Sequence, residues 1–125
     1  MKNKIIKINK EYNYDILKND MLFLNYEYPF FKINNIGEST LGEKIIYIKL
    51  GEGNKKLFIN ASHHANEWMT SLQTMLFIEK YLQLYKNKEN YKGYEINELW
   101  NKVSVFFVPM VNPDGVNLCL KNKKI

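Results

Sequence analysis

Arginine is missing from this chain of 125 residues, and histidine is limited to two adjacent copies, His63 and His64. All 18 basic residues are therefore lysine, and with 13 acidic residues they leave a formal net charge of +5. The single cysteine, Cys119, excludes an intramolecular disulfide and a metal site built from several thiolates. Apolar runs are too short to span a bilayer or to act as a secretory signal. We therefore expect a cytoplasmic protein with no membrane partner.

An excess of lysine is also typical of proteins that bind nucleic acids. Here, however, the lysines are scattered along the chain, and no nucleic-acid-binding motif accompanies them. We therefore expect no nucleic-acid partner. The hydrophobic content of 46% and the aromatic content of 14% are typical of a folded globular protein. The chain length suits one domain, which we assign to residues 1–125.

Hydrophobic periodicity predicts an α/β fold with a mixed sheet. Predicted helices cover residues 14–28, 68–86 and 96–102. Predicted strands cover residues 30–36, 46–50, 56–60 and 103–109. The glycine-rich turn at 51–54 predicts a hairpin between the second and third strands, and Cys119 is assigned to a last strand-like segment. The third strand, the long helix and the fourth strand form a βαβ unit, so these two strands should run parallel with a right-handed crossover.

Two polar segments follow the two predicted parallel strands. Residues 61–70 (ASHHANEWMT) follow one strand, and residues 112–115 (NPDG) follow the other. Because ligands bind beyond the carboxyl ends of parallel strands in open α/β sheets, we expect both segments to meet at one functional edge. His64 and Glu67 offer an imidazole and a carboxylate, which are two of the three protein ligands that a catalytic zinc site needs.

These residues alone leave other interpretations open. A histidine and a glutamate at this spacing occur together by chance in many proteins, and a glutamate at a helix start interacts favourably with the helix dipole. The NPDG segment has the composition of an ordinary tight turn. In an extended segment His63 would point away from His64, so we interpret it as a neighbour and not as a ligand.

Three segments together resemble a known family. They are residues 36–45 (IGESTLGEKI), 57–68 (LFINASHHANEW) and 108–116 (VPMVNPDGV). As an ordered set they resemble the zinc carboxypeptidases of the M14 family, and among them the bacterial branch that cleaves γ-D-glutamyl-diamino-acid bonds in cell-wall peptides. The resemblance implies an incomplete form of the three-layer zinc-carboxypeptidase fold, with helices flanking a mixed sheet. It also implies that His64 and Glu67 bind one Zn²⁺ ion, and that Asn112, Pro113, Asp114 and Gly115 border the cleft.

The resemblance further implies metal-assisted hydrolysis of peptide bonds, in which zinc activates a water while arginines hold the oxyanion and the substrate carboxylate. In the family the third zinc histidine, the general-base glutamate and an Asn-Arg pair come later than the segments matched here. We therefore assign no catalytic residue. Asn66 occupies a position where many carboxypeptidases have arginine. Asparagine at this position fits the cell-wall branch. Glu43 occupies another arginine position, and nothing in the sequence explains that reversal of charge.

Two functional hypotheses follow. In the first, the chain is the N-terminal portion of an M14 catalytic domain that takes a peptide or muropeptide substrate, is inactive alone and needs a C-terminal complementing segment. In the second, it is a non-catalytic truncated homologue that acts as a peptide-binding or regulatory module. A third interpretation is an α/β domain in which His64 and Glu67 are incidental. Because a sheet that stops after a central strand exposes an apolar edge, we also expect self-association of the isolated chain.

Overall fold

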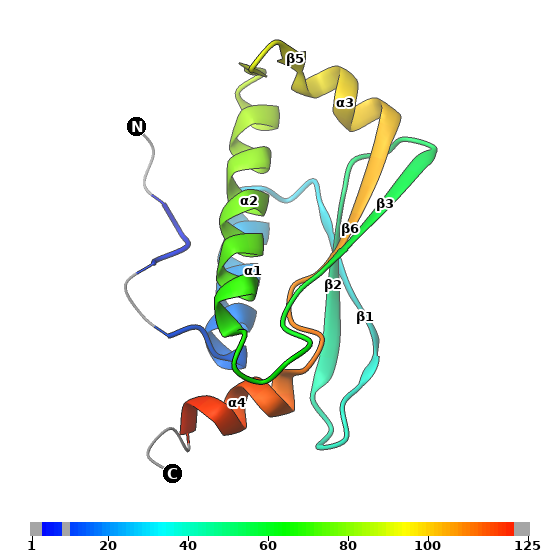
Figure 1. Ribbon diagram of the computed structural model, residues 1–125. Coiled ribbons are helices and arrows are strands. Elements are labelled where there is room, and N and C mark those ends of the chain that lie inside the picture. The colour runs from blue at the N-terminus through cyan, green and yellow to red at the C-terminus, as the bar shows by residue number, and fades with distance from the viewer. Residues whose placement is uncertain (1–3, 9–10, 122–125) are drawn as a thin grey trace.

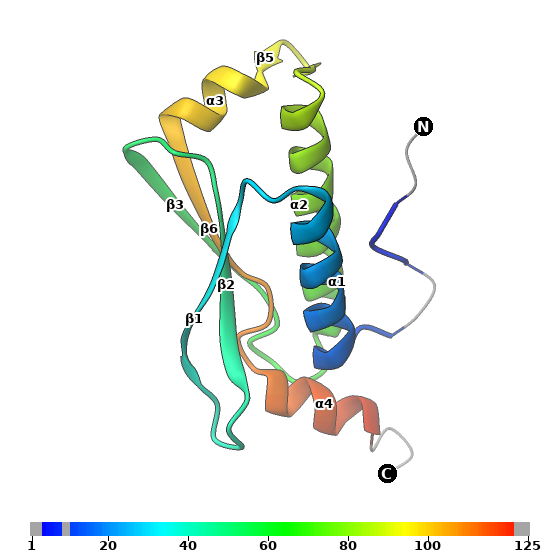
Figure 2. The same cartoon turned by 180° about the vertical axis from the view of Figure 1, so that it is seen from behind.

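The computed structural model describes residues 4–8 and 11–121, which form a mixed sheet with helices (Figure 1). In chain order the elements are α1 (Tyr14–Glu27), β1 (Lys32–Glu38), β2 (Lys44–Leu50), β3 (Lys55–Asn60), α2 (Trp68–Lys86), β4 (Asn90–Tyr91), β5 (Tyr94–Glu95), α3 (Ile96–Lys102), β6 (Val103–Val108) and α4 (Pro113–Lys121). Helices α1 and α2 lie on the same face of the larger sheet, and α4 lies across the starts of these two helices, beside the end of the sheet (Figures 1 and 2). None of the helices in this described part is long and apolar enough to cross a membrane.

The larger sheet has the strand order β1-β2-β6-β3. Strands β3 and β6 run parallel, with Leu57 opposite Val105, so the predicted βαβ unit is confirmed. The predicted hairpin between β2 and β3 is wrong, because β6 lies between these strands and pairs with both. The physical reason is the nearly continuous apolar sequence of β6, which suits a strand covered on both sides by neighbours.

Local signals predicted the helix bounds well. Asn13 caps α1 and accepts a hydrogen bond from the Ile16 amide at 2.8 Å, and α2 and α3 have the predicted limits. The assignment of Cys119 to a strand is wrong, because it lies in α4. Pro113 is the first residue of that helix, and the Asn112 side chain accepts a hydrogen bond from the Gly115 amide at 2.9 Å. Asparagine followed by proline favours a helix start as much as a turn.

One face of the sheet is packed, and the other is open. Ile48, Leu50 and Phe107 are buried in the core that the sheet shares with the helices. On the opposite face Phe58 stacks on Phe106 with ring centroids 5.1 Å apart, although the Phe58 side chain is 66% exposed. The helices of the described residues cover one face only, so the fold presents two layers of the three-layer architecture (Figures 1 and 2).

The apolar edge expected from the sequence belongs to β3. This strand pairs with β6 on one side and, within the described residues, with no strand on the other. Leu57 is 50% exposed there, and Phe77 of α2 is also exposed. An edge with free backbone groups and apolar side chains favours pairing with another strand. Self-association of the isolated chain stays a prediction, and this is the surface that would carry it.

Candidate functional site

The two polar segments singled out in the sequence meet at the carboxyl ends of β3 and β6. The Val111 amide donates to the Ala61 carbonyl at 2.9 Å, and the Asn112 amide donates to the Ser62 carbonyl at 3.0 Å. The Asn112 side chain donates to the carbonyl of His63 at 3.2 Å. Three hydrogen bonds therefore join the segment before α4 to the segment before α2. This is the convergence that the parallel arrangement of the strands predicts.

His64 and Glu67 lie on one turn of the loop that connects β3 to α2. The Glu67 amide donates to the His64 carbonyl at 3.0 Å, and Glu67 is the N-cap residue of α2 without using its side chain to cap. Both side chains are exposed. Within residues 4–8 and 11–121 neither the imidazole nor the carboxylate forms a hydrogen bond or an ion pair. Both groups are therefore free to bind a ligand from solvent.

The chemistry of this donor pair fits zinc, which binds imidazole nitrogen and carboxylate oxygen. A catalytic zinc site has three protein ligands, so this pair alone would not complete one. Among the described residues, no three histidine, cysteine, aspartate or glutamate side chains lie close enough together to hold a metal ion. His63 contributes its backbone carbonyl to the contact with Asn112, and its side chain is exposed. His64 and Glu67 are thus two candidate zinc ligands in the described part of the chain.

The segment of Asn112, Pro113, Asp114 and Gly115, expected as a loop, forms the cap and the first turn of α4 and has a structural role in the described chain. The Asp114 carboxylate accepts hydrogen bonds from the Ser39 hydroxyl at 2.8 Å and from the Leu41 amide at 3.0 Å. Asp114 therefore fastens the turn between β1 and β2 to the start of α4. Asn112 both caps α4 and holds the His63 carbonyl, so it connects this helix to the segment that bears His64.

Sequence reasoning missed three hydroxyl residues beside the site, Ser62, Thr70 and Ser71. Ser62 is 1% exposed and has a left-handed backbone, with φ of 55°. Serine rarely adopts this conformation, so the sequence gives no signal for it. The close spacing of one serine before the histidines and two hydroxyl residues at the start of the helix is the only pattern that could have drawn attention to them.

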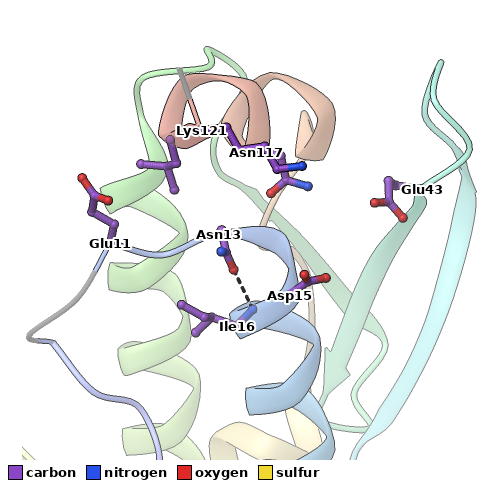
Figure 3. A pocket seen from close by; sticks show the side chains of 8 residues that line it. Glu11, Asn13, Asp15, Ile16, Glu43, Asn117 and Lys121 are labelled. Carbon is purple, nitrogen blue, oxygen red and sulfur yellow. Dashed lines mark hydrogen bonds between the residues drawn. The ribbon is translucent and has the colours of Figure 1, made fainter. Parts of the chain in front are cut away.

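A separate hollow lies between the start of α1 and α4 (Figure 3). Its volume is 520 Å³, and its lining includes the carboxylates of Glu11, Asp15 and Glu43 together with Lys121. None of its lining residues belongs to the loop that carries His64 and Glu67. A cluster of acidic side chains at a helix start does not identify a ligand, and this hollow is distinct from the candidate zinc ligands.

Replacing Gly115 with alanine is expected to displace the Asn112 side chain. A Cβ atom at Gly115 would lie 2.4 Å from Asn112 Nδ2 and 2.8 Å from its Cγ. The displaced side chain would lose its hydrogen bonds to the Gly115 amide and to the His63 carbonyl, at a cost of about 1–2 kcal/mol of unfolding free energy. Urea-induced unfolding measures this cost, with Leu118→Ala on the exposed surface of α4 as the control.

A double-mutant cycle tests the cause. Asn112→Ala removes the atoms that a new Cβ would meet, so the double variant Asn112→Ala with Gly115→Ala should be no less stable than Asn112→Ala alone. If the double variant instead loses the sum of the unfolding free energies lost in the two single variants, alanine at position 115 does not act by displacing Asn112.

Comparisons with known proteins place this geometry in a family. The family model described as zinc carboxypeptidase, Peptidase_M14, matches residues 18–125. Gamma-D-glutamyl-L-diamino acid endopeptidase 1 of Lysinibacillus sphaericus is 37% identical over 131 residues, which cover 98% of this chain and 33% of that protein. The uncharacterized protein YqgT of Bacillus subtilis (strain 168) is 36% identical over 100 residues, which cover 78% of this chain and 27% of that protein.

Solved structures show the same fold at low sequence identity. Thrombin activatable fibrinolysis inhibitor matches with a TM-score of 0.79 and 16% identity, over 98% of this chain and 31% of that chain. The carboxypeptidase A of Helicoverpa armigera matches with a TM-score of 0.68 and 19% identity, over 99% of this chain and 30% of that chain. The chain thus spans about a third of the length of the relatives it matches. It belongs to the M14 family of zinc carboxypeptidases.

Proposed function

We propose that this chain supplies two zinc ligands, His64 and Glu67, to a peptidase site that hydrolyses peptide bonds. The observation that carries the proposal is the turn that presents an unengaged imidazole and an unengaged carboxylate together at the carboxyl ends of β3 and β6. Zinc bound there would lower the pKa of a bound water and polarise the scissile carbonyl. The chain's own contribution is to hold these two ligands at the edge of the sheet.

The proposed substrates are peptides of the bacterial cell wall that contain γ-D-glutamyl-diamino-acid bonds. This part of the proposal is supported by the 37% identity to a protein named as a gamma-D-glutamyl-L-diamino acid endopeptidase. The chain contains no arginine, so it cannot itself provide a guanidinium for the oxyanion or for a substrate carboxylate. We therefore propose that these residues ligate the metal and that the residues that complete the site come from another segment.

Zinc titration of the purified chain tests the proposal. We expect isothermal calorimetry to show one Zn²⁺ ion per chain. His64→Ala and Glu67→Ala should each weaken the affinity by more than about tenfold, because each variant removes one of two protein donors. His63→Ala is the matched control, since it removes an adjacent exposed imidazole that we do not assign as a ligand. Equal losses for His63→Ala and His64→Ala would contradict the assignment.

The same samples separate the proposal from the alternative of a non-catalytic binding module. Such a module would bind a γ-D-glutamyl-diaminopimelate peptide saturably in the presence of a chelator, and His64→Ala would leave that affinity unchanged. A metal-dependent site would lose any peptide binding when the metal is removed. If Zn²⁺ does not bind to the wild-type chain and the peptide does, the binding module is the better description.

A further inference from the structure

We propose that Ser62 is the positioning residue for the His64 and Glu67 pair. Its left-handed backbone turns the chain out of β3, and its buried hydroxyl fastens that turn to the first turn of α2 and to the end of β6. This inference deepens the proposed function and rests on it for the identity of the ligands. It assigns the geometry of the pair to a network of side chains that do not touch the metal.

The backbone of Ser62 is the first part of the argument. Its φ of 55° lies in the left-handed region, where residues other than glycine are unfavourable by about 1–2 kcal/mol. Two other described residues besides glycine share this property, Lys88 and Lys92, and both are exposed lysines near the small hairpin of β4 and β5. Ser62 instead is 1% exposed. A strained residue in such a place persists only because its surroundings hold it there.

The surroundings of Ser62 hold it by hydrogen bonds from several directions. Its amide donates to Thr70 Oγ1 at 2.9 Å, and its carbonyl accepts from the Asn112 amide at 3.0 Å. Its hydroxyl lies 2.5 Å from the hydroxyl of Ser71 and 2.9 Å from the carbonyl oxygen of Glu67. Both polar backbone groups and the side chain of this residue are therefore engaged.

The hydroxyl groups of Ser62, Thr70 and Ser71 connect β3, α2 and β6. Ser71 Oγ lies 2.5 Å from the carbonyl oxygen of Pro109, and Thr70 Oγ1 lies 2.8 Å from that of Glu67. Each hydroxyl has one proton to donate. All three protons are used if Ser71 donates to Pro109, Thr70 donates to Glu67, and Ser62 shares its proton between Ser71 Oγ and the Glu67 carbonyl oxygen. The end of β3, the start of α2 and the end of β6 are then joined by one chain of hydrogen bonds, in which the links from Ser62 to Ser71 and from Ser71 to Pro109 are buried.

These hydrogen bonds hold the turn from His64 to Glu67 at both of its ends. Ser62 precedes His64 by two residues, and Thr70 holds the carbonyl of Glu67 itself. The turn is therefore fixed before a metal arrives, so little conformational freedom remains to be lost on binding. Outer groups that orient metal ligands in this way commonly change metal affinity by about 10–100-fold when they are removed.

Paired variants distinguish the hydroxyl of Ser62 from its backbone. Ser62→Gly keeps the left-handed conformation accessible and removes the hydroxyl, and Ser71→Ala breaks the same network from α2 without changing position 62. We expect each to weaken Zn²⁺ affinity about tenfold, and the double variant to lose little more than either single variant. Thr74→Ala is the matched control, because it removes a hydroxyl that donates to the Thr70 carbonyl one turn further along α2. It should leave the affinity unchanged.

Amide hydrogen exchange of the metal-free chain supplies a readout that does not require zinc. The Glu67 amide, bonded to the His64 carbonyl, reports directly on the turn. We expect this amide to exchange at least about tenfold faster in Ser62→Gly and in Ser71→Ala, while the amide of Phe107 in the core of β6 keeps its wild-type rate.

The outcomes separate this inference from the proposed function. Unchanged exchange at Glu67 in both variants overturns the positioning role, whatever the zinc titration shows. Equal acceleration at Glu67 and Phe107 also overturns it, because the hydroxyl would then stabilise the whole fold and not the turn. If the wild-type chain binds no Zn²⁺ while the Glu67 amide alone is released in the variants, the proposed function fails and the positioning of the turn stands.

Discussion

Replacing Gly53 with alanine is expected to leave most molecules of the chain unfolded. A Cβ atom at this position would lie 1.7 Å from the Lys102 carbonyl carbon, 2.0 Å from its oxygen and 2.1 Å from the Val103 nitrogen. These are backbone atoms at the junction of α3 and β6, and they cannot move aside as a flexible side chain can. The Ser104 hydroxyl also donates to the Gly53 carbonyl at 2.7 Å. The turn is therefore held against the very atoms that the new methyl group would meet.

The expected loss exceeds about 4 kcal/mol, which is characteristic of severe overpacking and is comparable to the whole stability of a small domain. Circular dichroism and urea-induced unfolding measure it. Gly42→Ala is the matched control, because its φ is +87° and a new Cβ there would have nothing within 4 Å. It should cost only the backbone strain, about 1–2 kcal/mol. If Gly53→Ala is as stable as Gly42→Ala, the backbone at Lys102 and Val103 can move to accommodate the new methyl group, which would contradict the prediction.

Gly53 also explains where the sequence-based prediction of the sheet failed. The segment 51–54 has the composition of a hairpin turn, and local reasoning therefore paired β2 with β3. In the structure this turn passes against the end of α3 and the start of β6, and the Glu52 amide donates to the carbonyl of Trp100 in α3 at 2.8 Å. The two strands are thus held one strand apart. Turn composition is a local property, whereas the insertion of β6 depends on contacts between distant segments.

What could be predicted followed from periodicity and from topology. Apolar residues that recur at helical spacing predicted the bounds of α2 and α3. The parallel pairing of β3 with β6 follows from the βαβ order. The same topology placed His64 and the 112–115 segment at one edge. Ser62 escaped prediction because its role depends on a backbone angle and on hydroxyl partners from α2, neither of which has a sequence signature.

The chain alone is expected to show no peptidase activity, and the remaining portion of a family member is expected to supply it. The chain contributes two candidate ligands in its described residues and contains no arginine. A suitable complement is the remaining part of the endopeptidase 1 of Lysinibacillus sphaericus, since this chain matches 33% of that protein. Mixing or co-expressing the two polypeptides should produce chelator-sensitive hydrolysis of a γ-D-glutamyl-diaminopimelate peptide, while each polypeptide alone should give none.

Three variants of this chain separate assembly from chemistry in that experiment. His64→Ala should assemble with the complement and yet be inactive, because the side chain is exposed and its proposed role is metal binding. His63→Ala should assemble and be active. Phe58→Lys places a charge on the open face of the edge strand β3, where the complement would dock, so assembly and activity should be lost together. Activity that survives His64→Ala would contradict the ligand assignment, and activity that survives Phe58→Lys would show that the complement docks elsewhere. Because each variant alters one exposed side chain, the fold of the chain is expected to be retained in all three, and the pattern of losses identifies which surface each step requires.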